Sequence, residues 1–117
     1  MTYIMGFVIA VPTANKDAYR EMAEAAALVF KKHGALSVVE AWGDDVPDGK
    51  LTSFPMAVKL QQDEAVVFSW IVWPSKEVLD TGNEAAMIEF EETGLMGSHL
   101  FDGKRMIFGG FQPIVEK

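Results

Sequence analysis

The first strongly apolar stretch of the chain, residues 3–11, has large apolar side chains at nearly every position. An extended chain places alternate side chains on opposite faces of a sheet. A strand that is apolar on both faces is covered on both faces in the folded protein. One face would carry Ile4, Val8 and Ala10, and the other Tyr3, Met5, Phe7, Ile9 and Val11.

A helical pattern follows this strand over residues 16–33, where apolar side chains recur every three or four positions opposite charged ones. The apolar positions are Tyr19, Met22, Ala23, Ala26 and Phe30. Gly34 suits the end of this helix, because glycine takes a positive φ without strain. Residues 36–43 then alternate as a second strand, which runs into a polar turn.

The second half of the chain repeats this order of elements. Residues 66–73 form the clearest strand, and Trp73-Pro74-Ser75 ends it much as Val11-Pro12-Thr13 ends the first. The stretch before it, residues 51–60, is ambiguous between an alternating strand and a short helical turn, and we favour the short helix because a proline follows Ser53 closely. The repetition indicates two related halves, each with a strand, a helix and a further strand.

A second long helix should begin at Ser75. We expect it to kink or break at Thr81-Gly82-Asn83, because glycine weakens a helix by about 1 kcal/mol relative to alanine. Residues 94–103 are predicted to form a loop and residues 105–115 the last strand. Within that strand Gly109-Gly110 permits a bulge or a close backbone approach.

The order strand, helix, strand, strand, helix, strand predicts an α+β protein of ferredoxin-like βαββαβ topology with a four-stranded antiparallel sheet. A length of 117 residues is typical of one domain, so we interpret residues 1–117 as a single ferredoxin-like domain. Two helices cover only one face of such a sheet, although the other face is apolar as well. A monomer rarely exposes an apolar patch beyond a few hundred Å². The simplest cover is a second copy, and we therefore expect a homodimer.

Charge and composition narrow the range of partners. The net charge is −7, with only 10 Lys and Arg, which argues against nucleic-acid binding and against anionic membrane surfaces. The chain has no cysteine, which excludes disulfides, thiolate nucleophiles and cysteine zinc sites. Residues 1–14 lack the basic segment of a signal peptide, and the uncharged stretch 65–75 is about half the ~20 residues of a membrane span. We therefore expect a cytoplasmic protein that contacts no membrane.

Two residues are candidates for proton transfer. Glu40 interrupts an apolar strand; facing an interior it would have a raised pKa and could act as a base, whereas facing solvent it is the polar half of an alternation. His99 lies in the predicted loop near Asp102 and Arg105, where an acid–base role competes with that of an ordinary surface residue.

Aromatic residues offer a candidate ligand site. Trp42, Trp70 and Phe108 could line a small apolar pocket between sheet and helices, or could belong to the core or the dimer interface. No phosphate-binding glycine loop, HExxH pair or GxSxG elbow is present, so no cofactor is expected. The carboxylates Asp44, Asp45 and Asp48 do not match the spacing of a calcium loop, and we expect no metal.

Four stretches resemble the YbaA-like family of bacterial domains of unknown function. They are Gly6-Phe7-Val8 with residues 11–16, then residues 39–50, 67–76 and 101–111. The resemblance implies a ferredoxin-like subunit in a dimeric α/β-barrel arrangement. It implies no activity, substrate or catalytic residue.

The preferred interpretation is a cytoplasmic homodimer that binds a small apolar or aromatic molecule in a sheet–helix cavity. One alternative is a cofactor-independent enzyme of oxygenase, isomerase or lyase type that uses Glu40 or His99 for proton transfer. Another is a structural or interaction module without a ligand. The register of the strands distinguishes them first, because it decides whether Glu40 faces a cavity.

Overall fold

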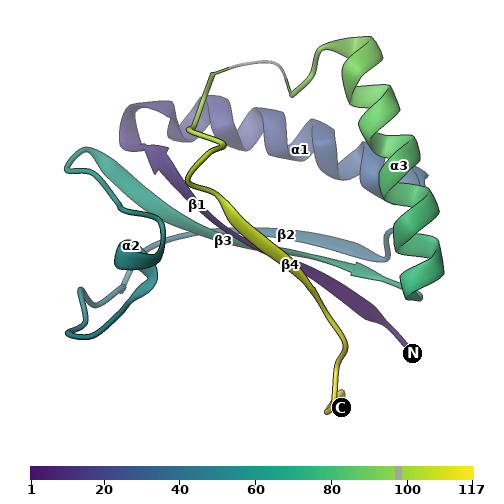
Figure 1. The fold of residues 1–117 in the computed structure, drawn as a ribbon. Helices are drawn as coiled ribbons and strands as arrows, with labels where there is room; N and C mark the ends of the chain where they lie inside the picture. Colours follow the sequence, from purple (N-terminus) through teal and green to yellow (C-terminus); the bar gives the residue numbers. More distant parts are fainter. Residues whose placement is uncertain (97–98) are drawn as a thin grey trace.

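Four antiparallel strands form one sheet in the order β2-β3-β1-β4 in the computed structural model, which describes residues 1–96 and 99–117 (Figure 1). The strands are β1 (Tyr3–Pro12), β2 (Ser37–Trp42), β3 (Glu64–Trp73) and β4 (Ile107–Phe111). A short 3₁₀ turn, η1 (Thr13–Asn15), joins β1 to the first helix. With the helices between the strands, this is the ferredoxin-like βαββαβ topology that the sequence predicts.

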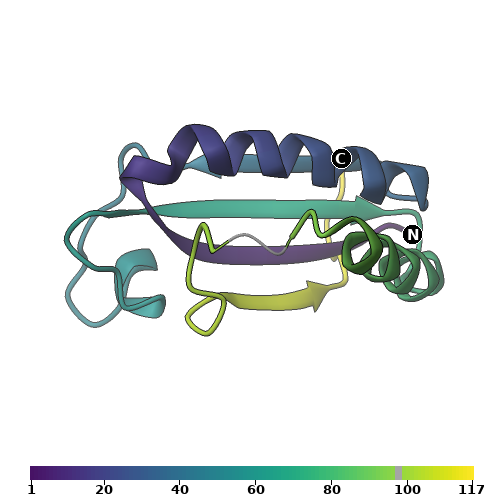
Figure 2. The same ribbon diagram turned by 90° about the horizontal axis from the view of Figure 1, so that it is seen from above.

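Two long helices, α1 (Lys16–Lys32) and α3 (Lys76–Thr93), lie on the same face of the sheet (Figures 1 and 2). The Ser75 side chain caps α3 by accepting a hydrogen bond from the Val78 backbone N–H at 3.1 Å. The short helix expected within residues 51–60 is confirmed as α2 (Phe54–Ala57), and it lies on the opposite side of the sheet (Figure 1). In the part of the chain that the structure describes, no helix is long and apolar enough to span a membrane.

The strand register assigns every second residue to the helix-covered face. Phe7 pairs with Ser69 of β3 and with Phe108 of β4, and Ser69 pairs with Glu40 of β2. The preceding residue of β1, Gly6, pairs with Trp70, and both lie on the other face of the sheet. Both faces of β1 are therefore apolar, as expected, and different parts of the molecule cover them.

The main core lies between the helices and the sheet. Its two clusters of buried side chains contain Ala26, Phe30, Ile71, Trp73, Leu79, Ala86 and Phe90, and Ile9, Val11, Tyr19, Met22, Ala23 and Val67. A smaller cluster lies on the opposite face, where Val58 and Leu60 cover Val8, Ala10 and Val66. The segment around α2 therefore covers one end of the face that the long helices leave free.

The kink expected at Thr81-Gly82-Asn83 is wrong, because α3 continues through it. Gly82 is a packing residue. A Cβ at this position would lie 2.3 Å from the His33 carbonyl oxygen and 2.5 Å from a ring carbon of Trp73. The glycine lets α3 approach the end of α1 and the buried Trp73 ring, which offsets its weak helix propensity.

The last strand is shorter than the predicted 105–115, since β4 contains only Ile107–Phe111. Its pairing with β1 is continuous from Val8↔Ile107 to Ile4↔Phe111, so no bulge occurs. Gly110 instead permits a close approach, because a Cβ there would lie 2.6 Å from the Tyr3 hydroxyl. The predicted loop 94–103 begins at the left-handed Gly94 (φ 70°), and its residues 97 and 98 lie outside the described residues.

Candidate functional site

A cavity of about 270 Å³ lies between the sheet and the two long helices. Strands β1, β2, β3 and β4, helices α1 and α3, and the segment after α3 all contribute to its wall. Most lining side chains are apolar, and five of them are Met5, Met22, Met87, Met96 and Met106. The polar side chains in the wall are Tyr19, Glu40, Ser69 and Asn83. This mixture of an apolar wall and a few polar groups is typical of small-molecule sites.

Glu40 is the ionisable carboxyl of this cavity. The β2–β3 register places it opposite the buried Ser69, so its side chain lies on the helix-covered face. The Tyr19 hydroxyl of α1 donates a hydrogen bond of 2.8 Å to Glu40 Oε1. Tyr19 is fixed in turn by burial and by an edge-to-face contact with Phe101, with the ring centroids 5.8 Å apart. The Glu40–Tyr19 pair therefore joins β2 to α1 at the cavity wall.

Burial raises the pKa of Glu40 above its ordinary value of 4.5, because desolvation penalises the carboxylate more than the Tyr19 hydrogen bond stabilises it. Burial and the Glu40 charge also raise the pKa of Tyr19 far above its ordinary value. Glu40 as a whole is an exposed residue of the edge strand β2, but its carboxyl lies beneath α1 against the buried Tyr19.

A groove of about 510 Å³ lies next to this cavity, between α1 and the edge strand β2. Tyr19 and Glu40 line both the groove and the cavity, so they form the boundary between them. Trp42 lies in the groove, with the Lys16 ammonium 5.3 Å from its ring centroid. This distance is typical of a cation–π contact. The groove is the solvent-facing side of the Glu40–Tyr19 pair.

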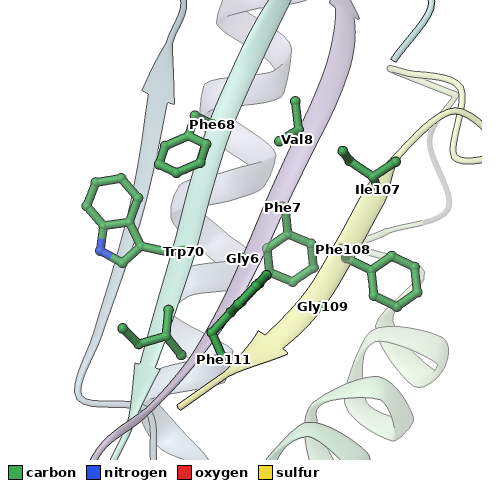
Figure 3. A pocket seen from close by; sticks show the side chains of 10 residues that line it. Gly6, Phe7, Val8, Phe68, Trp70, Ile107, Phe108, Gly109 and Phe111 are labelled. Atoms are coloured by element: carbon green, nitrogen blue, oxygen red, sulfur yellow. The ribbon is translucent and has the colours of Figure 1, made fainter. Parts of the chain in front are cut away.

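A third hollow, of about 590 Å³, lies on the opposite face of the sheet. Phe68 and Trp70 of β3 and Phe111 of β4 surround it (Figure 3). Phe68 also contacts Phe54 of the α2 segment, with ring centroids 5.7 Å apart. No ionisable side chain of the described residues lines this hollow. It is the largest of the three hollows, and it offers contact area but no acid–base group.

The structure separates the residues predicted from the sequence. Glu40 and Phe108 line the same cavity, where the Phe108 ring stacks on Phe7 with centroids 6.3 Å apart. Trp42 lies in the outer groove. Trp70 lines the hollow on the other face of the sheet, and Phe108 lines that hollow as well as the cavity. His99 is exposed, and it is not among the described residues that line the cavity. A single pocket containing all three aromatic residues is therefore not what the fold builds.

Arg105, the basic residue predicted to lie near His99, holds two segments of the chain together. The Arg105 guanidinium donates two hydrogen bonds to Glu64, of 2.8 and 2.7 Å, and one to Asp102 of 3.1 Å. It also donates to the carbonyls of Val58 and Lys59. These hydrogen bonds lower the pKa of Glu64 below its ordinary value. Arg105 thus ties the start of β4 to the α2 segment.

Sequence reasoning missed Tyr19 and Ser69 as site residues. Tyr19 follows the apolar spacing of the helix, and only its pairing with Glu40 across 21 positions reveals a polar role. Ser69 was visible as a polar residue within an apolar strand, which is the same signal that singled out Glu40. In the described part of the chain, no group of three or more His, Asp or Glu side chains is placed to hold a metal ion.

Comparisons with known proteins agree with this architecture. The family described as "Protein of unknown function (DUF1428)" matches residues 2–103. The chain is 56% identical to "Uncharacterized protein YbaA" of Escherichia coli K12 and to the protein of the same description from Shigella flexneri, over all of each chain. Among solved structures, Rv0793 from Mycobacterium tuberculosis superposes with a TM-score of 0.54 at 13% identity, covering 99% of this chain and 98% of that one. The de novo designed protein Foldit4 superposes with a TM-score of 0.50 at 12% identity, covering 97% of this chain and 99% of that one. At such identities these two structures support the fold alone.

Proposed function

The chain belongs to the DUF1428 family of proteins of unknown function, and from its own cavity we propose that it binds a small apolar or aromatic molecule between sheet and helices. The observation that carries this proposal is the cavity of about 270 Å³, which is lined by apolar side chains around one hydrogen-bonded carboxyl. An apolar wall supplies affinity, and a few fixed polar groups orient the ligand. In this proposal residues 1–117 act as one domain of a cytoplasmic homodimer.

The size and lining of the cavity agree with such a ligand. An engineered apolar cavity of about 150 Å³ holds benzene, so a cavity of about 270 Å³ has room for a one-ring or two-ring compound. Methionine side chains adapt to irregular shapes and make favourable contacts with aromatic rings. Phe7, Phe30, Phe101 and Phe108 supply further aromatic surface in the same wall.

The homodimer follows from the face of the sheet that the long helices leave free. Phe68 is 44% exposed and Phe111 60% exposed on this face. The molecule measures 37 × 36 × 21 Å, so its broad face is large enough for the roughly 800 Å² per partner that a stable complex buries. The chain also leaves β4 on this side of the sheet (Figure 1), and its tail carries the exposed Ile114. A second copy of the same sheet would cover this apolar surface.

A thermal-shift and calorimetry screen tests the binding proposal. We expect small one-ring and two-ring aromatic compounds to stabilise the wild-type protein. A cavity-filling variant, Ala26→Phe, should abolish the stabilisation while a matched change on the exposed side of α1, Ala18→Phe, should leave it intact. Silence of the wild-type protein across a broad library would contradict the proposal and favour a structural or interaction module.

A second candidate function is favoured by the Glu40–Tyr19 pair. A carboxyl with a raised pKa at an apolar cavity is suited to act as a general base. Glu40 would take a proton from a carbon next to a carbonyl group, which leaves a neutral carboxylic acid and an enolate, and would return the proton at another position. The protein would then be an isomerase-type enzyme that needs no cofactor.

Solvent exchange tests this second candidate. A cyclic ketone such as 2-tetralone should exchange its α-hydrogens for deuterium faster with the wild-type protein in D₂O than with Glu40→Gln, as followed by proton NMR. Equal rates for both proteins and for buffer alone would exclude a base role of Glu40 toward such compounds.

A further inference from the structure

We propose that the ligand of the sheet–helix cavity is a neutral ring compound with a hydroxyl group, a phenol or an enol, which donates its O–H to Glu40. This inference rests on the ligand-binding function proposed above and specifies the chemical class that the same site selects. The geometry points to it through three features of the wall, which are its charge, its free hydrogen-bonding capacity and its apolar surface.

Charge excludes the acids first. Glu40 is the one charged side chain among the described residues that line the cavity, and no Lys or Arg belongs to that wall. A carboxylate ligand would lose its hydration without gaining a cation and would be repelled by Glu40. Lys16 and Arg20 lie in the outer groove, where Asp17 and Glu24 accompany them.

Hydrogen-bonding capacity favours a donor. A carboxylate has about four acceptor sites. Within the described residues Tyr19 supplies one hydrogen bond to Glu40, at Oε1. In the proposed complex, a donor on the ligand takes one of the remaining sites. Tyr19 therefore fixes the carboxyl in place and leaves it able to accept a further O–H.

The number of donors distinguishes a hydroxyl from an amine. An ammonium group has three donors and a full charge, and all must be satisfied when it leaves water. A phenol or an enol has one donor on an otherwise apolar ring. This matches a wall that combines one carboxyl with apolar side chains such as Met87, Met106 and Phe108.

Matched probes test the inference in calorimetric titrations at neutral pH. The two-ring set is 2-naphthol, 2-methoxynaphthalene, 2-naphthoate and 2-naphthylmethylamine, and the one-ring set is phenol, anisole, benzoate and benzylamine. Because a hydrogen bond to a charged group is stronger than one between neutral groups, the hydroxyl compound of the set that fits should bind about tenfold or more tightly than its methyl ether. It should also bind more tightly than the acid and the amine.

The Glu40→Gln variant supplies the second arm, because it keeps the shape of the side chain and removes its charge. The preference for hydroxyl over ether should fall several-fold in Glu40→Gln and persist in Glu21→Gln, a matched change on the exposed side of α1. Tyr19→Phe should retain the preference, because it leaves the Glu40 acceptor sites available to the ligand.

The outcomes separate the two proposals. Binding of all ring compounds with equal affinity, tighter binding of the acid or the amine, or an unchanged preference in Glu40→Gln would overturn the hydroxyl inference and leave ligand binding in place. Binding of no probe from either set would overturn the proposed function itself.

Discussion

The two faces of the sheet consist of alternate residues of the same strands, yet they differ in chemistry. On the helix-covered face, Glu40 and Ser69 interrupt the apolar pattern beside a cavity that α1 and α3 enclose. On the opposite face, Phe68, Trp70 and Phe111 surround a hollow without an ionisable group in the described residues (Figure 3). The polar groups lie on the face that the helices cover, and the purely apolar surface lies on the face that they leave free. In the proposed function, the first face binds a small molecule and the second face contacts a second copy of the chain.

The largest effect is expected from a charge on the apolar face. Phe68→Glu places a carboxylate at the centre of the proposed subunit contact, where it would be buried without a partner. We expect the dissociation constant of the dimer to rise about 100-fold or more. Leu28→Glu is the matched control, because Leu28 is also an exposed apolar residue but lies on α1. Sedimentation velocity measures both. If Phe68→Glu associates as tightly as the control, this face is not the contact.

Crowding the helix-covered face should have the next largest effect. Gly82→Ala drives a Cβ into the His33 carbonyl oxygen and the Trp73 ring, so the protein should lose about 1–3 kcal/mol of unfolding free energy or more, despite the better helix propensity of alanine. At Gly103 a Cβ meets nothing within 4 Å, so Gly103→Ala should change stability little. Denaturant titration of both variants decides the point. Equal stability of the two would show that Gly82 does not hold α3 against the sheet.

A smaller effect concerns the α2 segment, which covers one end of the apolar face. The Arg105 hydrogen bonds lower the pKa of Glu64, and 8% of the Glu64 side chain is exposed. A lowered pKa means that the stabilisation is present above the ordinary carboxyl value of 4.5 and is lost as pH falls through the folded-state pKa.

Glu64→Gln should therefore be less stable than the wild-type protein at neutral pH and should lose less stability on acidification below 4.5. The exposed Glu92 offers a control, Glu92→Gln, which should follow the wild-type curve. Urea unfolding at several pH values provides the measurement. Parallel curves for Glu64→Gln and the wild-type protein would exclude a stabilising role of the Arg105–Glu64 pair.

The smallest expected effect concerns Glu40 on the helix-covered face, where the pKa shift has the opposite sign to that of Glu64. Burial raises the pKa of Glu40, so its stabilising contribution is complete below the ordinary carboxyl value and is lost as pH rises through the folded-state pKa. Glu40→Gln should match the wild-type protein in stability at acid pH and exceed it at neutral pH. The same urea experiments test this. A variant that is less stable at neutral pH would indicate that the charged form of Glu40 is held favourably.

Much of this fold could be predicted from the sequence, because its elements carry local signals. The apolar strand 66–73, the helical spacing from Tyr19 to Phe30 and the need to cover two sheet faces all follow from side-chain periodicity. The kink predicted at Gly82 was wrong, because this position needs a glycine for its close contact with Trp73. No local sequence pattern contains such a tertiary contact.

The candidate site was less accessible from the sequence. Glu40 stood out because it is a charge in an apolar strand, but Tyr19 looked like an ordinary core residue. Trp42 and Trp70 were grouped by residue type, yet the register places them on opposite faces of the sheet. A single-residue shift exchanges the two faces, so composition alone cannot assign a strand aromatic to either.

Sedimentation equilibrium of the unmodified protein at micromolar concentration tests the contrast between the two faces most directly. A covered apolar face predicts a particle of twice the chain mass of 12.9 kDa, with Phe68 and Phe111 protected from solvent. A particle of 12.9 kDa, with those side chains freely accessible, would contradict it.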